Sequence, residues 1–436
     1  MNSFFKMKYY HYLFISAIIV LASCAKTEDK VVQVTSPTDY EAYLSTSRTK
    51  NYTNAVAERD FWSNKMSDDT TGVGSLGPLA GAYTTLFTTT GGIQNLYNSE
   101  KLLKKAIINS AHNKDGYTRS LAHNYISQHR FKEAKEILEE SYNGISNKRA
   151  TEHVLFDVYM ELGQYDKAYQ MLERVKNNSD YNYLIRVAKW SDYKGDLASA
   201  INFLEKAREI ADSRKSKTLQ IWTYTNLGDY YGHAGRIQDA YTEYLKTLRL
   251  DPENAYAKKG IAWILYAAEK NTKAANKILD SVVVHHKAPD YLLLKAEMAE
   301  YNNNEAESDK YTNQFLSAVA QGKYGAMYNA YLIEIYSDKD PAKALQLAQT
   351  EVENRATPET YHLLALAQLK ANKPQEALET IKSNVEGKTS EPMALYHSAL
   401  VYKATGNTEK VKAHKTQLLE AEFEVGPVLF KKIQDL

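Results

Sequence analysis

Cysteine is almost absent from this 436-residue sequence, which contains only Cys24. A disulfide within the chain is therefore impossible, and a metal site built from paired cysteines is excluded. Proline and glycine are also scarce, with 9 and 19 residues. Because short strands and tight turns depend on these two residues, their scarcity favours an all-helical protein.

An excess of charge of one sign is missing as well. The 54 lysines and arginines nearly balance the 53 aspartates and glutamates. A nucleic-acid-binding surface needs clustered positive charge, so we expect no nucleic acid as a partner. The 44% of hydrophobic residues is ordinary for a folded chain and allows a large core.

The sequence begins with a segment typical of secretion. Lys6 and Lys8 form a short basic stretch, and the apolar run from Leu13 to Ala22 follows it. At about ten residues this run is too short to cross the ~30 Å hydrocarbon core of a bilayer as a permanent helix. The pattern predicts a secretory signal peptide, and an uncleaved single-span anchor is the alternative.

The four residues Leu-Ala-Ser-Cys at 21–24 resemble the lipobox of bacterial lipoproteins. The resemblance implies cleavage before Cys24, so that residues 1–23 are the signal peptide. It also implies that the thiol and the new amino group of Cys24 are acylated and hold the protein on a membrane. Two or three acyl chains anchor a protein stably, since each buried CH₂ contributes about 0.8 kcal/mol. Residues 24–37 are polar and are expected to form a flexible tether.

The residues after Cys24 indicate in which membrane the lipoprotein would be anchored. Ala25 stands where an aspartate retains enterobacterial lipoproteins in the inner membrane, so the resemblance implies the outer membrane. The pair Glu28-Asp29 loosely matches lipoproteins of Bacteroidota that are displayed on the cell surface. Both the periplasmic and the cell-surface face stay open.

One stretch of the sequence resembles the tetratricopeptide repeat consensus. The matching positions are Leu227, Gly228, Tyr231, Gly235, Ala240, Tyr244 and Pro252. Gly228 and Ala240 are small, which lets two antiparallel helices approach closely. The resemblance implies a pair of helices with Gly235 in the turn between them and Pro252 after the second helix.

The same twelve-residue spacing of small residues recurs along the chain. The pairs are Ala122 and Ala134, Ala188 and Ala200, Ala262 and Ala274, Ala296 and Ser308, and Ala365 and Ala377, and Ala168 stands at the second position opposite Phe156. A repeat of about 34 residues predicts a solenoid. We therefore expect an all-α, right-handed superhelical solenoid of about ten antiparallel helix pairs over residues 78–436. A helical cap and a glycine-containing loop would precede it over 38–77, and the first repeat would have about seven extra residues in its turn.

No combination of residues predicts catalysis, a metal or a cofactor. Gly387-Lys388-Thr389 lacks the first glycine of a phosphate-binding loop, because Lys382 stands there, so a turn is expected. His285 and His286 are adjacent, and neighbouring helical side chains point about 100° apart, which predicts a solvated loop rather than a metal site. We expect a protein that is not an enzyme.

Tetratricopeptide solenoids bind ligands along a concave groove lined by the first helix of each pair. The resemblance places nine residues there: Lys189, Tyr193, Trp222, Asp229, His233, Tyr256, Lys259, Trp263 and Tyr266. Aromatic rings among charges suit a peptide or glycan platform. The alternative is that Trp222 and Trp263 are buried between neighbouring helices.

Together these features predict a membrane-anchored lipoprotein that acts as a scaffold for an envelope protein or peptide. The alternative is capture of glycans or nutrients beside an outer-membrane importer. Starch-binding lipoproteins of that kind also carry tetratricopeptide-like helices, but long irregular segments interrupt them.

Overall fold

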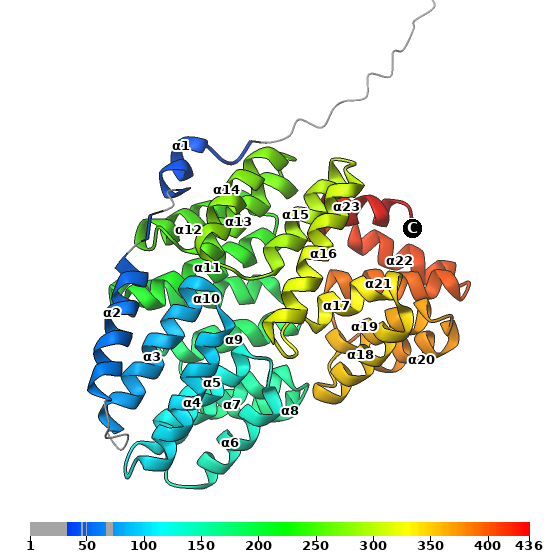
Figure 1. Ribbon diagram of the computed structural model, residues 1–436. Helices are drawn as coiled ribbons and strands as arrows, with labels where there is room; N and C mark the ends of the chain where they lie inside the picture. The colour runs from blue at the N-terminus through cyan, green and yellow to red at the C-terminus, as the bar shows by residue number, and fades with distance from the viewer. Residues whose placement is uncertain (1–32, 45–46, 49, 67–72) are drawn as a thin grey trace, which may run out of the picture.

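The computed structural model describes residues 33–44, 47–48, 50–66 and 73–436. In these ranges the chain forms 23 α-helices, one short 3-10 helix and no strand (Figure 1). Cys24, the signal segment and the first part of the predicted tether lie outside the described residues. Within the same ranges, no helix combines the length and the apolar character needed to span a membrane.

After a short start the helices follow one another in antiparallel pairs. Two short elements come first, α1 (Pro37–Tyr40) and η1 (Glu41–Leu44), followed by the longer α2 (Lys50–Lys65). The ten pairs are α3 (Val73–Thr90) with α4 (Ile93–Asn109), α5 (Lys114–Ser127) with α6 (Phe131–Asn143), α7 (Lys148–Glu161) with α8 (Tyr165–Arg174), α9 (Tyr181–Tyr193) with α10 (Leu197–Ser213), α11 (Lys217–His233) with α12 (Ile237–Leu250), α13 (Ala255–Ala267) with α14 (Thr272–His285), α15 (Asp290–Tyr301) with α16 (Glu305–Gly322), α17 (Asn329–Lys339) with α18 (Pro341–Asn354), α19 (Pro358–Lys370) with α20 (Pro374–Asn384), and α21 (Pro392–Ala404) with α22 (Thr408–Leu418). A last helix, α23 (Glu422–Gln434), follows them.

Local chemistry explains where the helices begin and end. Four consecutive helices, α18 to α21, start with a proline at the first helical position, where its missing N–H costs nothing. Nine of the ten pairs have a left-handed residue in the turn between their helices; these are Gly91, His129, Gly163, Gly195, Gly235, Lys270, Asn303, Asn372 and Gly406. Such a residue ends one helix sharply and lets the next return along it.

Small residues mark the contacts within the pairs. Those that are 0 or 1% exposed are Ala122, Ala134, Ala168, Ala188, Ala200, Ala240, Ala262, Ala365 and Ala377. In the central pair, a Cβ atom on Gly228 would lie 2.5 Å from Cε1 of Tyr244. A Cβ atom on Gly260 would also lie 2.5 Å from the same ring. The ring of Tyr244 is therefore held between α11 and α13, and both glycines are needed to make room for it.

One predicted contact residue is wrong by one position. Ala274 is partly exposed, whereas Ala275 is fully buried. The turn before α14 contains the left-handed residue Lys270 and is one residue longer than the turn before α12. The helix therefore starts one residue later, which rotates Ala275 toward α13.

The start of the solenoid also differs from the prediction. Pro78 does not begin the first repeat after a loop, because it lies inside α3, which begins at Val73. The extra residues of the first pair do not enlarge its turn either. They lengthen α3 to 18 residues and leave only Gly91 and Gly92 between α3 and α4.

The end of the predicted tether is packed on the solenoid. The backbone N–H groups of Val34 and Thr35 donate to Oε1 of Glu269, at 2.7 and 2.6 Å. Tyr241 donates its hydroxyl to the carbonyl oxygen of Ser36, at 3.3 Å. Residues 34–36 are therefore fixed against α12 and the turn between α13 and α14, and this part of the tether prediction is wrong.

The superhelix turns far enough to bring distant repeats together. Nη1 of Arg355, before α19, lies 3.1 Å from Oε2 of Glu161 in α7. Lys287, between α14 and α15, donates its backbone N–H to the carbonyl of Thr90 at the end of α3, at 2.8 Å. Segments about 200 residues apart in the sequence are therefore in direct contact.

Candidate functional site

The first helices of the pairs form the inner layer of the solenoid. Successive first helices contact one another, as α5 does α7, α7 does α9, and α11 does α13. Close spacing of one layer curves the array toward it, so this layer is concave. The nine predicted groove residues all lie on inner helices: two on α9, three on α11 and four on α13.

The beginnings of α11 and α13 are open. Together with α2, α3 and the turn before α15 they line a cavity of about 970 Å³, called here the open cavity. Trp222 on α11 is 40% exposed and Tyr256 on α13 is 55% exposed, and both line this cavity. Aromatic side chains that line a concave site are candidates for contact with a ligand.

Hydrogen bonds fix the aromatic and charged groups of the open cavity. The carboxylate of Asp229 accepts from the hydroxyls of Tyr256 and Tyr244, each at 2.6 Å. Burial raises the pKa of Asp229. Nζ of Lys259 lies 2.6 Å from Oδ2 of Asp290. The ring of Tyr256 is therefore positioned before any ligand arrives, which lowers the entropy cost of binding.

Polar side chains surround the two exposed rings. Four amides line the cavity: Asn51, Asn54, Asn226 and Asn254. His286 is also in the lining, and its Nδ1 is 3.0 Å from the hydroxyl of Tyr291. Burial lowers the pKa of His286 to about 4, so its ring is neutral at pH 7. The predicted loop is confirmed at His286, which follows α14 and is half-buried, but not at His285, which is the last residue of α14.

The ends of the same two helices are covered by the chain itself. Residues 422–427 are the part of α23 that leads up to and includes its kink at Gly426, and they are called here the docked turn. The docked turn lies against α11, α13 and α15. Nε1 of Trp263 donates to the carbonyl oxygen of Phe423 at 3.0 Å. Nδ1 of His233 is 2.9 Å from Oε1 of Glu424. Figure 1 shows α23, in red, beside α15.

Tyr266 lies beneath this cover. It is fully buried, and its hydroxyl donates to Oε1 of Glu297 at 2.9 Å. Its ring meets that of Trp263 edge to face, with centroids 5.6 Å apart. Tyr266 is therefore part of the core, and it is not available as a groove residue.

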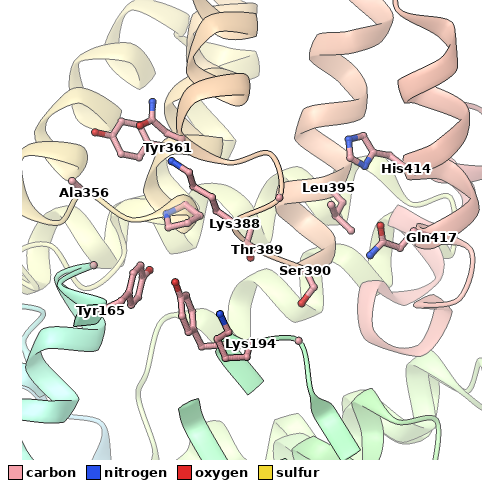
Figure 2. Close-up of a pocket in the computed structure, with 16 residues that line it drawn as sticks. Tyr165, Lys194, Ala356, Tyr361, Lys388, Thr389, Ser390, Leu395, His414 and Gln417 are labelled. Carbon is pink, nitrogen blue, oxygen red and sulfur yellow. The ribbon is translucent and has the colours of Figure 1, made fainter. Parts of the chain in front are cut away.

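The two residues predicted on α9 lie apart from both regions. Nζ of Lys189 is paired with Oε1 of Glu161 at 2.8 Å. Tyr193 stacks on Tyr165, with ring centroids 4.1 Å apart, and both line a second cavity of about 780 Å³. Figure 2 shows this cavity between Tyr165 and Lys194 on one side and Ser390 and His414 on the other. The structure therefore divides the predicted groove into three separate places.

Neither a metal site nor a phosphate loop emerges from the part of the chain that the structure describes. No group of three or more His, Cys, Asp or Glu side chains there could hold a metal ion. Residues 385–388 form a turn, as predicted for Gly387 and Lys388.

Sequence reasoning missed the docked turn. The repeat pattern ends before it, and no spacing rule predicts which inner helices a terminal helix will reach. A local signal was present, because Gly426-Pro427 interrupts an otherwise helical stretch. Gly426 has φ 75° and ψ 165°, a conformation that side chains other than glycine rarely adopt.

Comparison with protein-family models finds no match, and no curated protein matches the chain. Among solved structures, the human IFIT1 dimer with m7Gppp-AAAA is 20% identical, covers 70% of this chain and 75% of its own, and has a TM-score of 0.38. Yeast Tom70 is 14% identical, with coverage of 88% and 89% and a TM-score of 0.40. A tetratricopeptide repeat protein from Parabacteroides merdae is 16% identical, with coverage of 58% and 97% and a TM-score of 0.33.

The fold itself is defined by the chain's own geometry. Ten antiparallel helix pairs follow one another over the described residues, small residues are buried within several of them, and left-handed residues form the turns within all but one. This protein is a tetratricopeptide-type helical solenoid.

Proposed function

We propose that this protein is a scaffold of the bacterial cell envelope, anchored through a lipidated Cys24, and that its open cavity holds a segment of a partner protein. The tetratricopeptide-type fold supports a protein-interaction role. The observation that carries the proposal is the exposure of Trp222 and Tyr256 inside the open cavity. Aromatic anchors in a preformed concave site are typical of residues that dominate binding energy. The proposal involves no catalytic step.

The tether sets how far the scaffold stands from the membrane. The chain is fixed from Val34 onward by Glu269. The ten residues from Cys24 to Val34 reach about 35 Å at most when fully extended. A lipidated Cys24 would therefore keep the solenoid close to the bilayer, with α13 and α14 near the point of attachment. Partners would be proteins of that membrane or of its immediate surroundings.

Site-specific crosslinking in living cells tests the proposal. A photoreactive amino acid at Trp222 or Tyr256 is expected to capture an envelope protein. The matched control is Tyr169, an aromatic side chain on α8 that is 45% exposed but lies outside the open cavity. Capture from Trp222 and Tyr256 but not from Tyr169 supports the scaffold. Equal capture from all three, or none from the cavity, contradicts it.

The anchor and its membrane face need a separate experiment. Cys24→Ser is expected to release the protein from the membrane fraction. Protease added to intact cells would then degrade a surface-displayed wild-type protein and spare a periplasmic one. Retention of the Cys24→Ser variant in the membrane would contradict the lipid anchor.

Glycan binding is the second candidate, and the four amides beside the exposed rings favour it. Sugar rings stack on aromatic faces, and their hydroxyls pair with amide groups. Calorimetry with envelope and host polysaccharides would detect such binding, and Trp222→Ala should abolish it. Without any binding polysaccharide, this candidate fails and the scaffold is unaffected.

A further inference from the structure

We propose that the covered ends of α11 and α13, with α15, form a second peptide-binding site, and that the docked turn is its resident ligand. The ligand it fits is a protein segment in which an aromatic residue is flanked by two carboxylates, as Phe423 is by Glu422 and Glu424. A partner carrying this pattern would displace the docked turn. This inference rests on the contacts of the docked turn and is independent of the open cavity.

The aromatic residue Phe423 lies in a recess formed by Gly232 and Trp263, called here the seat. Gly232 on α11 leaves the space that Phe423 fills, because a Cβ atom there would lie 2.8 Å from Cε1 of the ring. Gly232 is the last residue but one of α11. Trp263 holds the backbone at the same residue through its hydrogen bond to the carbonyl oxygen.

Each carboxylate beside the ring faces a basic group, although the carboxyl groups of Asp192 and Glu391 also lie near Glu424. Glu424 faces His233 at 2.9 Å, and Oε1 of Glu422 is 3.1 Å from Nζ of Lys270. One cation comes from the end of α11 and the other from the turn after α13. Lys270 and the protonated form of His233, on either side of the Phe423 ring, favour an acid–aromatic–acid pattern, since electrostatic complementarity sets specificity.

Partly exposed ion pairs and a small buried cluster hold the docked turn. Its ion pairs are partly exposed: the side chains of Lys270 and Glu422 are 28% and 51% exposed, and such pairs contribute about 1 kcal/mol or less. Both parts of α23 contact the last pair, because Val425 of the docked turn and Ile433 of the later part lie in one buried cluster with Leu395 and Leu418. The kink at Gly426 separates the two parts. Release of the docked turn therefore has to expose Val425 as well as Phe423, while Ile433 can stay packed.

Gly426 provides a way to vacate the site without altering it. A Cβ atom there would lie 2.8 Å from both Cη2 of Trp263 and Oε1 of Glu297. The backbone at Gly426 also has a positive φ of 75°. Gly426→Val is therefore expected to dislodge the docked turn from an intact seat. Phe423→Ala is a second variant that empties the space over Gly232.

The test measures binding in trans by the full-length chain. The probe is a fluorescent synthetic peptide of residues 418–430, and the control peptide carries Phe423→Ala. The tethered segment competes at an effective concentration in the millimolar range, so the wild-type chain should bind the probe about 100-fold more weakly than Gly426→Val. The control peptide should bind neither chain. Hydrogen exchange of residues 422–426 reports whether the turn has left.

Two results would overturn the inference. If the docked turn is released but the probe does not bind, the inner face has no peptide site there. If neither Gly426→Val nor Phe423→Ala releases the turn, α23 is a fixed cap and cannot be displaced. Binding of the probe to the wild-type and variant chains with equal affinity would place it on another surface and would also contradict the proposal.

Discussion

The two ends of the inner helices α11 and α13 differ although they belong to one continuous face. At their beginnings, Trp222 and Tyr256 remain exposed in the open cavity. At their ends, Trp263 is partly buried under the docked turn and Tyr266 is fully buried. The repeat pattern treats these positions alike. Whether a ring is available to a partner is decided by a segment about 160 residues away in the sequence.

Both ends depend on one contact between the helices. The ring of Tyr244 fills the space between Gly228 and Gly260, and its hydroxyl reaches Asp229, which also holds Tyr256. A change at this contact should therefore disturb the open and the covered regions together. Substitutions farther along the helices should disturb one of these two regions without the other.

The largest effect is expected for Gly228→Leu. A leucine side chain has to displace the Tyr244 ring, and overpacking of this kind costs about 3 kcal/mol or more. The expected result is a lower thermal midpoint, with loss of both the open cavity and the docked turn. Circular dichroism measures the midpoint. Gly81→Ala is the control, because Gly81 is a helical glycine with nothing within 4 Å of the added Cβ. A midpoint for Gly228→Leu equal to that of the control would refute the helix register.

A smaller effect is expected for Trp263→Ala, and it should be confined to the covered ends of α11 and α13. The ring packs under the docked turn and its Nε1 donates to Phe423. Because it is only partly buried, its loss should cost about 1 to 3 kcal/mol, less than for a fully buried tryptophan. Residues 422–426 should then exchange their amide hydrogens faster. Trp222→Ala should leave that exchange unchanged; if both variants accelerate it, the two ends are not independent.

Docking should also depend on pH. Burial raises the pKa of Glu297 from 4.5 to about 7, with Glu300 raising it further and Lys432 and the Tyr266 hydroxyl opposing the shift. A carboxyl group whose folded-state pKa is raised favours folding when it is protonated, so this stabilisation is lost as the pH rises through about 7. We expect the docked turn to be better protected from exchange at pH 6 than at pH 8, after correction for intrinsic exchange rates. Glu297→Gln should flatten this difference.

The titration of His233 changes the stability of docking with pH in the same direction as the titration of Glu297. Burial lowers its pKa, but the hydrogen bond and charge of Glu424 together with the charges of Asp229 and Asp192 outweigh burial, and the net pKa is raised. Protonated His233 therefore favours docking, and its contribution is lost as the pH rises through the raised pKa. Better protection at pH 8 than at pH 6 would contradict both assignments.

The smallest effect is expected for Lys270→Ala. Its ion pair with Glu422 is partly exposed, so its loss should cost at most about 1 kcal/mol and should weaken with added salt. The exchange of residues 422–426 should change several-fold at most. A change as large as that of Trp263→Ala would mean that charge, and not the aromatic seat, holds the turn.

The sequence alone determined the helix pairs, because each pair is specified by residues close together. The spacing of Gly228 and Ala240, Gly235 in the turn and the tyrosines at 231 and 244 suffice to predict a close antiparallel contact. Where a turn gained one residue, as before α14, the same local logic misassigned the contact to Ala274. The core role of Tyr231 and Tyr244 was also predictable, since both fill the space around that contact.

Only the tertiary structure decided which part of the inner face is open. The curvature of the solenoid sums small rotations over ten pairs, and no single repeat encodes where the chain will meet itself. The contacts of Phe423 with Trp263, of Val34 with Glu269 and of Arg355 with Glu161 all follow from that sum. For this reason nine positions that the repeat pattern places in one groove became an open cavity, a covered seat and a separate pair on α9.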